Sequence, residues 1–197
     1  MKADYFYFEK RIAEIDRVLA DSMSEEMDRS VPKDEHRRLY DKRGRRREQM
    51  FANMAAHIIK MCLELHISTL LIGDLCGLAH DKPCKGNTNM WGYKELITRM
   101  SITPENYGIA AFEVPEDGTS KVCARHGCEV QREPRGLVRC PFGHAMHADL
   151  NAAMNILKRA GGGEPLRVKV LSFIPTASKV ISVNEKEKSS NPALKAG

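Results

Sequence analysis

Apolar residues recur at helical spacing near the N-terminus. Steps of four, three and four residues predict an amphipathic helix with these positions on one face: Phe8, Ile12, Ile15 and Leu19. The polar stretch 23–32, which ends in proline, predicts a connection between helices. Helical spacing resumes over 51–65, and we expect this second helix to begin inside the basic block 42–47. The first third of the chain is therefore predicted to be a helical pair.

The pattern changes to short apolar runs after the second helix. Residues 68–72 and 109–114 are runs bounded by turn-forming residues, which predicts two buried strands. A short helix is expected near 90–100 and another over 149–159, the latter ended by a run of glycines. Helices that alternate with buried strands are typical of an α/β sheet.

Cysteines and histidines cluster between the second strand and the last helix. Five candidate metal ligands lie there, in two groups: Cys123, His126 and Cys128, then Cys140 and His144. Residues 129–138 between the groups predict a hairpin with a Pro-Arg-Gly turn. Tetrahedral zinc takes four sulfur or nitrogen ligands, and two knuckles joined by a hairpin are typical of a zinc ribbon. His126 is the preferred partner of Cys123 because a two-residue gap closes a knuckle readily, with Cys128 as its substitute; the alternative is a set of unligated thiols.

Positive charge is distributed unevenly along the chain. The net charge is only +5, but it includes the dense block 42–47. Uneven basic charge favours a polyanionic partner. The candidate nucleic-acid contacts are Arg43, Arg45, Arg46, Arg47 and Arg135. The alternative interpretation of such a run is a solvated helix face.

The remaining composition excludes two classes of protein. No apolar run reaches the roughly 18 to 20 residues that span a bilayer, and the N-terminus lacks the apolar core of a signal peptide. The expected localisation is therefore cytoplasmic. In that reducing compartment the six cysteines are expected to be metal ligands or buried thiols rather than disulfides.

Several motifs, taken in order, resemble those of a known family. Thr119-Ser-Lys, the paired knuckles and the run His147-Ala-Asp-Leu-Asn-Ala-Ala-Met-Asn-Ile-Leu-Lys158 are similar to the C-terminal half of TnpB (OrfB) proteins. These are transposon-encoded, RNA-guided DNA nucleases related to type V CRISPR effectors. Asp4-Tyr-Phe-Tyr-Phe-Glu and Asn89-Met-Trp-x-Tyr-x-x-Leu96 resemble its archaeal-type branch. The resemblance runs from about residue 4 to residue 160.

The resemblance implies a partial RuvC-like (RNase H) fold with an inserted zinc ribbon and an N-terminal helical pair. The corresponding segments are 1–66 for the helices with the basic block, 67–118 and 145–160 for the nuclease core, 119–144 for the zinc ribbon, and 161–197 for a partly disordered tail.

The resemblance also implies a catalytic centre in which three carboxylates hold two Mg²⁺ ions about 4 Å apart. The third acid maps onto Asp149, whose alternative role is an N-cap at a helix start. The first acid has no counterpart in this chain, and Gly73 takes the place of the second. Asp74 is adjacent but should point to the other face of its strand. Glu116 is the expected substitute, with Glu113 a weaker candidate and an exposed loop acid the alternative role of Glu116.

The implied function is the C-terminal portion of a transposase-associated, RNA-guided DNA endonuclease that acts in DNA recombination by a transposable element. Its cofactors would be structural Zn²⁺ and catalytic Mg²⁺, and its partners DNA and a guide RNA. Because the matching acids are incomplete, we expect the isolated chain not to cut DNA, which leaves enzymatic activity open. The alternative is a non-catalytic zinc-ribbon protein that binds nucleic acid, or a truncated remnant.

Overall fold

The computed structural model describes residues 2–21, 30–74, 92–134, 136–163 and 171–183. The chain divides into two compact units. The first comprises Met1–Ile58, Asn89–Trp91 and Leu171–Gly197, and the second Ile59–Thr88 and Gly92–Val170. Each unit is described by itself.

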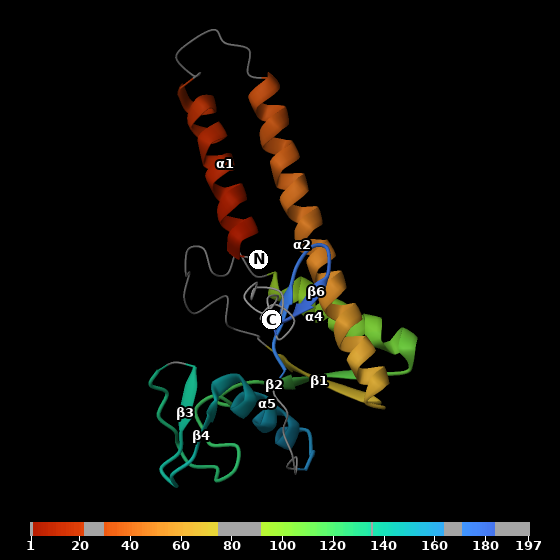
Figure 1. Ribbon diagram of the computed structural model, residues 1–197, viewed down its shortest axis with the longest axis vertical. Helices are drawn as coiled ribbons and strands as arrows, with labels where there is room; N and C mark the ends of the chain where they lie inside the picture. Colours follow the sequence, from red (N-terminus) through yellow and green to blue (C-terminus); the bar gives the residue numbers. More distant parts are fainter. Residues whose placement is uncertain (1, 22–29, 75–91, 135, 164–170, 184–197) are drawn as a thin grey trace, which may run out of the picture. The chain divides into compact units, whose positions relative to one another are not determined.

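Two helices, α1 (Lys2–Asp21) and α2 (Ser30–Glu64), form the body of the first unit and run side by side (Figure 1). The apolar stripe predicted on α1 lies in their core, where Phe8, Ile12, Ile15 and Leu39 are buried against one another. The amphipathic helix is thus confirmed. The predicted start of the second helix is wrong, because α2 already begins at Ser30. Proline is tolerated in a first helical turn, where its missing N–H has no partner to lose.

Ion pairs line the interface between α1 and α2. Arg43 Nη1 lies 2.6 Å from Glu9 Oε1, and the Arg46 guanidinium donates to both carboxylate oxygens of Asp4, at 2.9 and 3.0 Å. Each exposed pair contributes at most about 1 kcal/mol, so the apolar core dominates the stability of the hairpin. Arg11–Glu35 is a further ion pair along the same interface, where His36 Nε2 also lies 3.0 Å from Asp16 Oδ1.

A β-hairpin completes the first unit. β5 (Phe173–Pro175) pairs antiparallel with β6 (Val180–Ser182). Asn53 on α2 donates to the Thr176 carbonyl at 3.0 Å, and the His57 ring lies 4.4 Å from the Phe173 ring. The predicted tail therefore contains an ordered hairpin, while 184–197 lie outside the described residues. None of the helices in the described ranges has both the length and the apolar character that crossing a membrane would need.

A two-stranded parallel sheet forms the centre of the second unit. β1 (Thr69–Asp74) pairs with β2 (Ala110–Pro115), and α4 (Tyr93–Ile102) with the 3₁₀ helix η1 (Thr103–Tyr107) connects them. Parallel strands need such a crossover connection, which explains why the two apolar runs are separated by a helix. Both predicted strands are present, and the predicted helix near 90–100 corresponds to α4. The predicted burial of the strands is wrong, because β1 residues are exposed or half-buried and Val114 is the one buried residue of β2.

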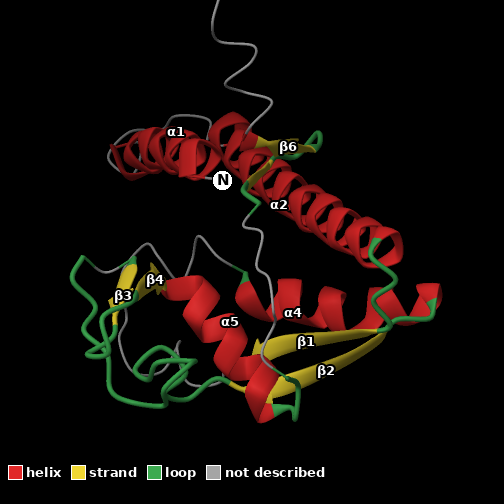
Figure 2. Cartoon of the chain, turned by 60° about the horizontal axis from the view of Figure 1, so that its bottom comes forward, coloured by secondary structure: helices red, strands yellow, loops and turns green. Residues whose placement is uncertain are grey.

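The Cys/His segment follows β2 and leads into α5. It contains β3 (Leu137–Arg139), which pairs antiparallel with β4 (Ala145–His147). α5 (Ala148–Arg159) then returns to pack against the sheet (Figure 2). The helix ends as predicted at the glycine run, because Gly161 adopts φ 80°, a left-handed conformation that glycine reaches without strain.

Candidate metal centre and carboxylate site

Two tight turns present the cysteines and histidines of the module. In the first, the Gly127 N–H donates to the Cys123 carbonyl at 2.8 Å, and in the second the Gly143 N–H donates to the Cys140 carbonyl at 3.0 Å. Both glycines have positive φ, 67° and 88°, which permits each chain reversal. The His126 N–H also points at Cys123 Sγ, at 3.4 Å, and would stabilise a thiolate there.

The two turns bring four donor atoms together. One ligand atom from each residue lies within 4.8 Å of all the others in the set Cys123, His126, Cys140 and His144. Cys123 Sγ lies 3.4 Å from His144 Nε2, and His126 Nδ1 lies 3.2 Å from Cys140 Sγ. Cys123 and Cys140 are buried, at 1% and 7% exposed. Two sulfurs and two imidazole nitrogens at this spacing can bind a metal ion.

Cys128 lies beside this cluster. Its sulfur is 3.5 Å from Cys140 Sγ, and its side chain is only half-buried. His126 rather than Cys128 belongs to the group whose donor atoms all approach one another. The geometry therefore favours the preferred ligand set and leaves Cys128 as its neighbour.

Asp149 stands in the first turn of α5. The N-cap residue is His147, whose ring Nδ1 accepts from the Asp149 N–H at 3.3 Å. The alternative role of Asp149 as the N-cap is therefore wrong. The Asp149 side chain is 92% exposed and its Oδ2 lies 3.6 Å from His147 Nδ1. Because capping is done by the histidine, the Asp149 carboxylate remains available for another partner.

Glu116 takes the space that a side chain at Gly73 would fill. An added Cβ at Gly73 would lie 2.7 Å from Glu116 Oε2 and 2.9 Å from Ile156 Cδ1 of α5. The register explains this, since Gly73 pairs with Val114, and Glu116 is two residues further along the same face. The carboxylate of Glu116 thus lies over the strand position that the resemblance assigns to the second acid.

Gly73→Ala should therefore be destabilising, although alanine normally suits a strand better than glycine. A methyl group at 2.7 Å from a carboxylate oxygen displaces Glu116, and overpacking of this kind typically costs about 1–3 kcal/mol. Urea unfolding measures the change. Gly136→Ala, where an added Cβ meets nothing within 4 Å, is the control. Equal stability of both variants would contradict the close approach.

The surroundings of Glu116 concentrate negative charge. Burial raises the pKa of its carboxyl, and the charges of Asp117, Asp149 and Asp74 raise it further. The three aspartates come from β1, the turn after β2 and α5. Carboxylates gathered in this way repel one another, and a bound cation would offset that repulsion. The donor set, all carboxylate oxygens, suits Mg²⁺.

Glu113, the weaker candidate, lies on the other face of the sheet. It pairs with Ile72, one register position from Gly73, and its Oε1 accepts from Ser101 Oγ of α4 at 2.9 Å. Asp74 pairs with Pro115, so its strand position also alternates away from that of Gly73. Asp149 is thus one of three acids whose charge acts on Glu116, whereas Glu113 lies on the opposite face, toward α4.

The polar face of α5 holds the segment that leads from β2 to the first turn. The Asn151 side chain is fully buried, accepts from the Ala124 N–H at 2.9 Å and donates to the Val122 carbonyl at 2.8 Å. Asn155 donates to the carbonyls of Thr119 and Val122, at 2.7 and 2.9 Å. These amides satisfy backbone groups in a stretch without regular structure.

The C-terminal turn of α5 continues the same contacts. Lys158 donates to the Ala124 carbonyl, and Arg159 donates to the carbonyls of Pro115, at 2.6 Å, and Asp117. From the sequence alone we did not identify Asn151, Asn155 and Arg159 as residues that hold this segment. The available signal was a polar stripe at four-residue spacing, formed by Asn151, Asn155 and Arg159.

Asn151→Ala should strongly destabilise the second unit. It leaves the buried Ala124 N–H without its side-chain acceptor and opens a cavity at a fully buried position, at a cost of about 3 kcal/mol. The free energy of unfolding in urea measures this loss. Asn155→Ala should cost less, because Asn151 still serves the carbonyls that Asn155 contacts. A larger effect at Asn155 would contradict this ranking.

The predicted nucleic-acid contacts fall into different environments. Arg43 and Arg46 are engaged with Glu9 and Asp4 on α1. Arg47 is half-buried, and Arg135 lies outside the described residues. Of the five, Arg45 is the exposed one with no ion-pair partner within the ranges that the structure describes.

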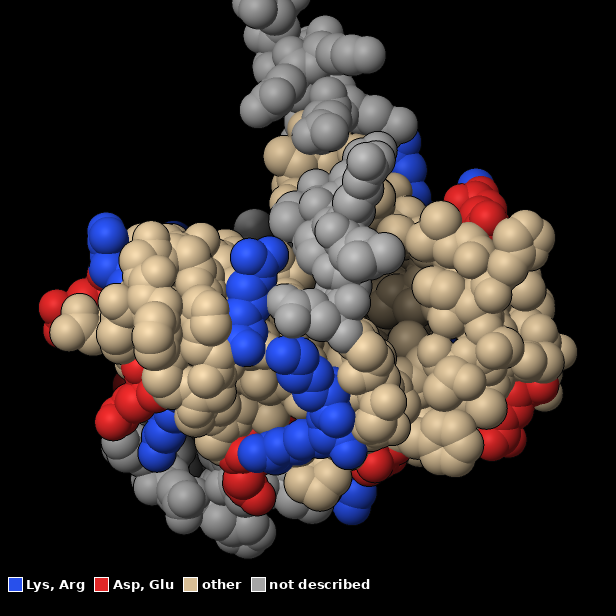
Figure 3. Space-filling view, turned by 90° about the horizontal axis from the view of Figure 1, so that it is seen from below, with Lys and Arg blue, Asp and Glu red and all other residues tan. Residues whose placement is uncertain are grey.

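Arg45 belongs to an exposed basic stripe on α2. Arg38, Lys42 and Arg45 are spaced at i, i+4 and i+7, which places them on one helix face, and all three are exposed. This face differs from the one that carries Leu39, Arg43 and Arg46 toward α1. Figure 3 shows a row of Lys and Arg side chains, with Asp and Glu side chains beside it, on the face seen from below.

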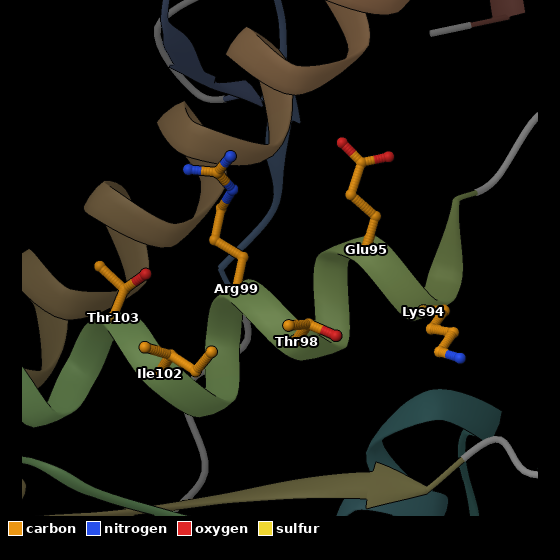
Figure 4. Close-up of a pocket in the computed structure, with 6 residues that line it drawn as sticks. All are labelled: Lys94, Glu95, Thr98, Arg99, Ile102 and Thr103. Carbon is orange, nitrogen blue, oxygen red and sulfur yellow. The ribbon is translucent and has the colours of Figure 1, made fainter.

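A shallow groove follows α4 (Figure 4). Its lining is mixed in charge and polarity: Lys94, Glu95, Thr98, Arg99, Ile102 and Thr103. Arg99 and Glu95 point to the same side of the helix, whereas Lys94 points to the opposite side. This groove contains none of the residues of the Cys/His cluster or the Glu116 site.

Two family models and a curated relative match this chain. Residues 1–79 match the family model described as "Probable transposase", and residues 93–156 match that of the Cas12f1-like TNB domain. The TnpB-like protein ORF457 of Acidianus two-tailed virus is 40% identical over 186 residues, which cover 92% of this chain and 40% of that protein. The chain therefore spans well under half the length of this relative.

Two solved structures share the fold. The Cas12f1–sgRNA–target DNA complex matches 78% of this chain and 41% of that chain, with a TM-score of 0.57 and 23% identity. The CRISPR-Cas12f ternary complex matches 79% and 33%, with a TM-score of 0.61 and 21% identity. The matches therefore indicate a transposase-associated protein that is similar to the Cas12f nucleases. These matches support a TnpB-family protein, related to the type V effectors.

Proposed function

We propose that this chain provides a metal-binding module and part of the catalytic centre of a RuvC-like, RNA-guided DNA endonuclease. The observation that carries the proposal is the position of Glu116 over Gly73, within electrostatic reach of Asp149. A carboxylate from the end of β2 then substitutes for the acid that is missing at Gly73 of β1. Asp149 and Glu116 would hold Mg²⁺, which supplies an activated water and stabilises the leaving oxygen of a phosphodiester.

The Cys/His cluster is proposed to hold a structural Zn²⁺ through Cys123, His126, Cys140 and His144. Two thiolates and two imidazoles suit zinc, and four protein ligands leave no open position for catalysis. The module lies between Glu116 and Asp149 in the sequence, as an insertion does. The two metals would therefore occupy separate sites, one structural and one catalytic.

The carboxylate site is tested by binding of Mn²⁺, a paramagnetic substitute for Mg²⁺, to the zinc-loaded full chain. Glu116→Gln and Asp149→Asn should each weaken Mn²⁺ binding by more than about tenfold, the loss that is typical when a residue behind a metal ligand is removed. Water-proton relaxation measures the affinity. Glu113→Gln removes the same charge from the other face and should leave the affinity close to the parent value. Equal effects of Glu113→Gln and Glu116→Gln would contradict the assignment.

A carboxylate exchange sharpens the test. Gly73→Glu alone clashes with Glu116, and Glu116→Ala alone removes the ligand, so both single variants should bind Mn²⁺ weakly. The double variant moves the carboxylate to β1 and vacates the space beside it. Restored binding in the double variant is expected, and failure to restore it would count against a shared position. The expectation that the chain alone does not cut DNA is tested with Mg²⁺ and a DNA substrate in the same preparations.

A second candidate function is nucleic-acid binding without catalysis. The exposed stripe Arg38, Lys42 and Arg45 favours it, because three cations on one helix face match successive phosphates of a polyanion. The carboxylate variants distinguish the candidates, since binding through the stripe should not depend on Asp149. DNA and a guide RNA are the proposed polyanions by family resemblance.

A further inference from the structure

The Glu116 side chain sits at the end of β2, where the chain leaves the sheet. Thr119 contributes to fixing the turn there, because both its N–H and its Oγ1 donate to the Glu116 carbonyl, at 3.0 and 2.8 Å. Thr119 is 1% exposed. These bonds define the turn, but both come from within the turn itself. From another element, α5, Asn155 holds the far end of the turn at the Thr119 carbonyl, at 2.7 Å.

Arg159, in the last turn of α5, contacts the turn directly beside Glu116. Its two terminal nitrogens reach the carbonyls of Pro115 and Asp117, the residues on either side of Glu116. A guanidinium presents donors in a rigid plane, so it can fix two carbonyls at once, whereas an ammonium is a single point. Asp149 stands in the first turn of the same helix. Arg159 therefore ties the backbone of one proposed metal ligand to the helix that carries the other.

We propose that Arg159 is a positioning residue for Glu116. It clamps the backbone at 115 and 117, so that the Glu116 carboxylate stays over Gly73 and within reach of a cation held with Asp149. This inference rests on the proposed function, because it gives the clamp a role in cation binding. Lys158 makes an otherwise comparable contact to the Ala124 carbonyl, which lies well beyond Glu116.

Electrostatics and positioning predict opposite results for Arg159→Ala. Removing a positive charge near carboxylates should by itself tighten the binding of a cation. Removing a clamp should weaken binding, by about tenfold if Arg159 acts as outer-shell partners of metal ligands usually do. The sign of the change therefore separates the two roles. Arg159→Lys keeps the charge but loses the fork, and should weaken binding to an intermediate extent.

The experiment measures Mn²⁺ affinity of the zinc-loaded full chain for the parent, Arg159→Ala, Arg159→Lys and Lys158→Ala. Lys158→Ala is the matched control, since it removes one positive charge from the adjacent residue without touching 115–117. It should bind Mn²⁺ as tightly as the parent or more tightly. Affinity for Mn²⁺ in Arg159→Ala that equals or exceeds the parent value would overturn the proposal.

Amide hydrogen exchange gives a readout that needs no metal. The Thr119 N–H donates to the Glu116 carbonyl, so its exchange reports opening of this turn. Arg159→Ala should accelerate it about tenfold, while amides in the middle of α5 keep their rates. Unchanged exchange at Thr119 would overturn the clamp. A parent chain that binds no Mn²⁺ would instead refute the proposed carboxylate site, and the positioning role would fall with it.

Discussion

Cys140→Ala should abolish metal binding by the Cys/His module and unfold it. Cys140 Sγ lies 3.2 Å from His126 Nδ1, and three remaining donors cannot close a tetrahedral structural site. Structural zinc contributes about 10–16 kcal/mol in zinc-finger peptides, far more than a module this small can replace by apolar burial. We expect one Zn²⁺ per parent chain and none in the variant, measured by elemental analysis of purified protein.

Two other cysteine variants show whether the loss is specific. Cys62→Ala is the matched control, since Cys62 is buried in α2 and burial raises the pKa of its thiol, which favours the protonated form that does not ligate. It should keep full zinc. Cys128→Ser should also keep zinc, whereas His126→Ala should lose most of it. Loss of zinc on Cys128→Ser with retention on His126→Ala would reverse the assignment of the fourth ligand.

Neutralising the exposed stripe of α2 should reduce affinity for nucleic acid and its salt dependence. Arg38→Gln with Arg45→Gln removes two candidate phosphate contacts, and each contact contributes about 0.9 to the slope of log K against log salt on duplex DNA. The slope should fall by about 1.8, which corresponds to about 50-fold weaker binding near 0.1 M salt. Fluorescence anisotropy with a labelled duplex over a series of salt concentrations measures both quantities.

Arg43→Gln with Arg46→Gln is the matched control, because it removes the same charge from the same helix. These arginines are paired with Glu9 and Asp4, so the variant should lower the melting temperature of the hairpin and change the salt slope little. Identical slopes for the two double variants would show that only net charge matters. A larger change for the paired arginines would contradict the stripe as the binding surface.

Residue spacing along the chain predicted the helices and strands that depend on neighbouring residues. The spacing from Phe8 to Leu19 reports neighbours one turn apart, and this stripe is the core of the α1–α2 hairpin. The runs at 68–72 and 109–114 became β1 and β2 because short apolar runs bounded by turn residues favour strands, although of β1 and β2 only Val114 is buried. The start of α2 was misplaced by more than three turns, since the polar stretch 30–41 carries no regular apolar period to detect.

The roles of charged side chains depend on which residues lie next to them in the fold, and the sequence alone does not show this. Arg46 and Asp4 are 42 positions apart, so pairing on α1 could not be distinguished from exposure on α2. Asp149 was open between a cap and a ligand until the structure showed His147 as the cap. Both ambiguities share one physical reason, which is that a charged side chain serves equally well in several roles until its neighbours are known.

By itself the sequence determined the helical pair, the two strands and the spacing of Cys123, His126, Cys140 and His144. These follow from contacts between residues close along the chain, where periodicity and turn chemistry decide. Only the tertiary structure decided that Glu116 lies over Gly73 and that Arg159 holds the backbone on either side of it. Those contacts depend on the register of β1 with β2 and on the return of α5, and the 44 positions between Pro115 and Arg159 leave no local pattern that records them.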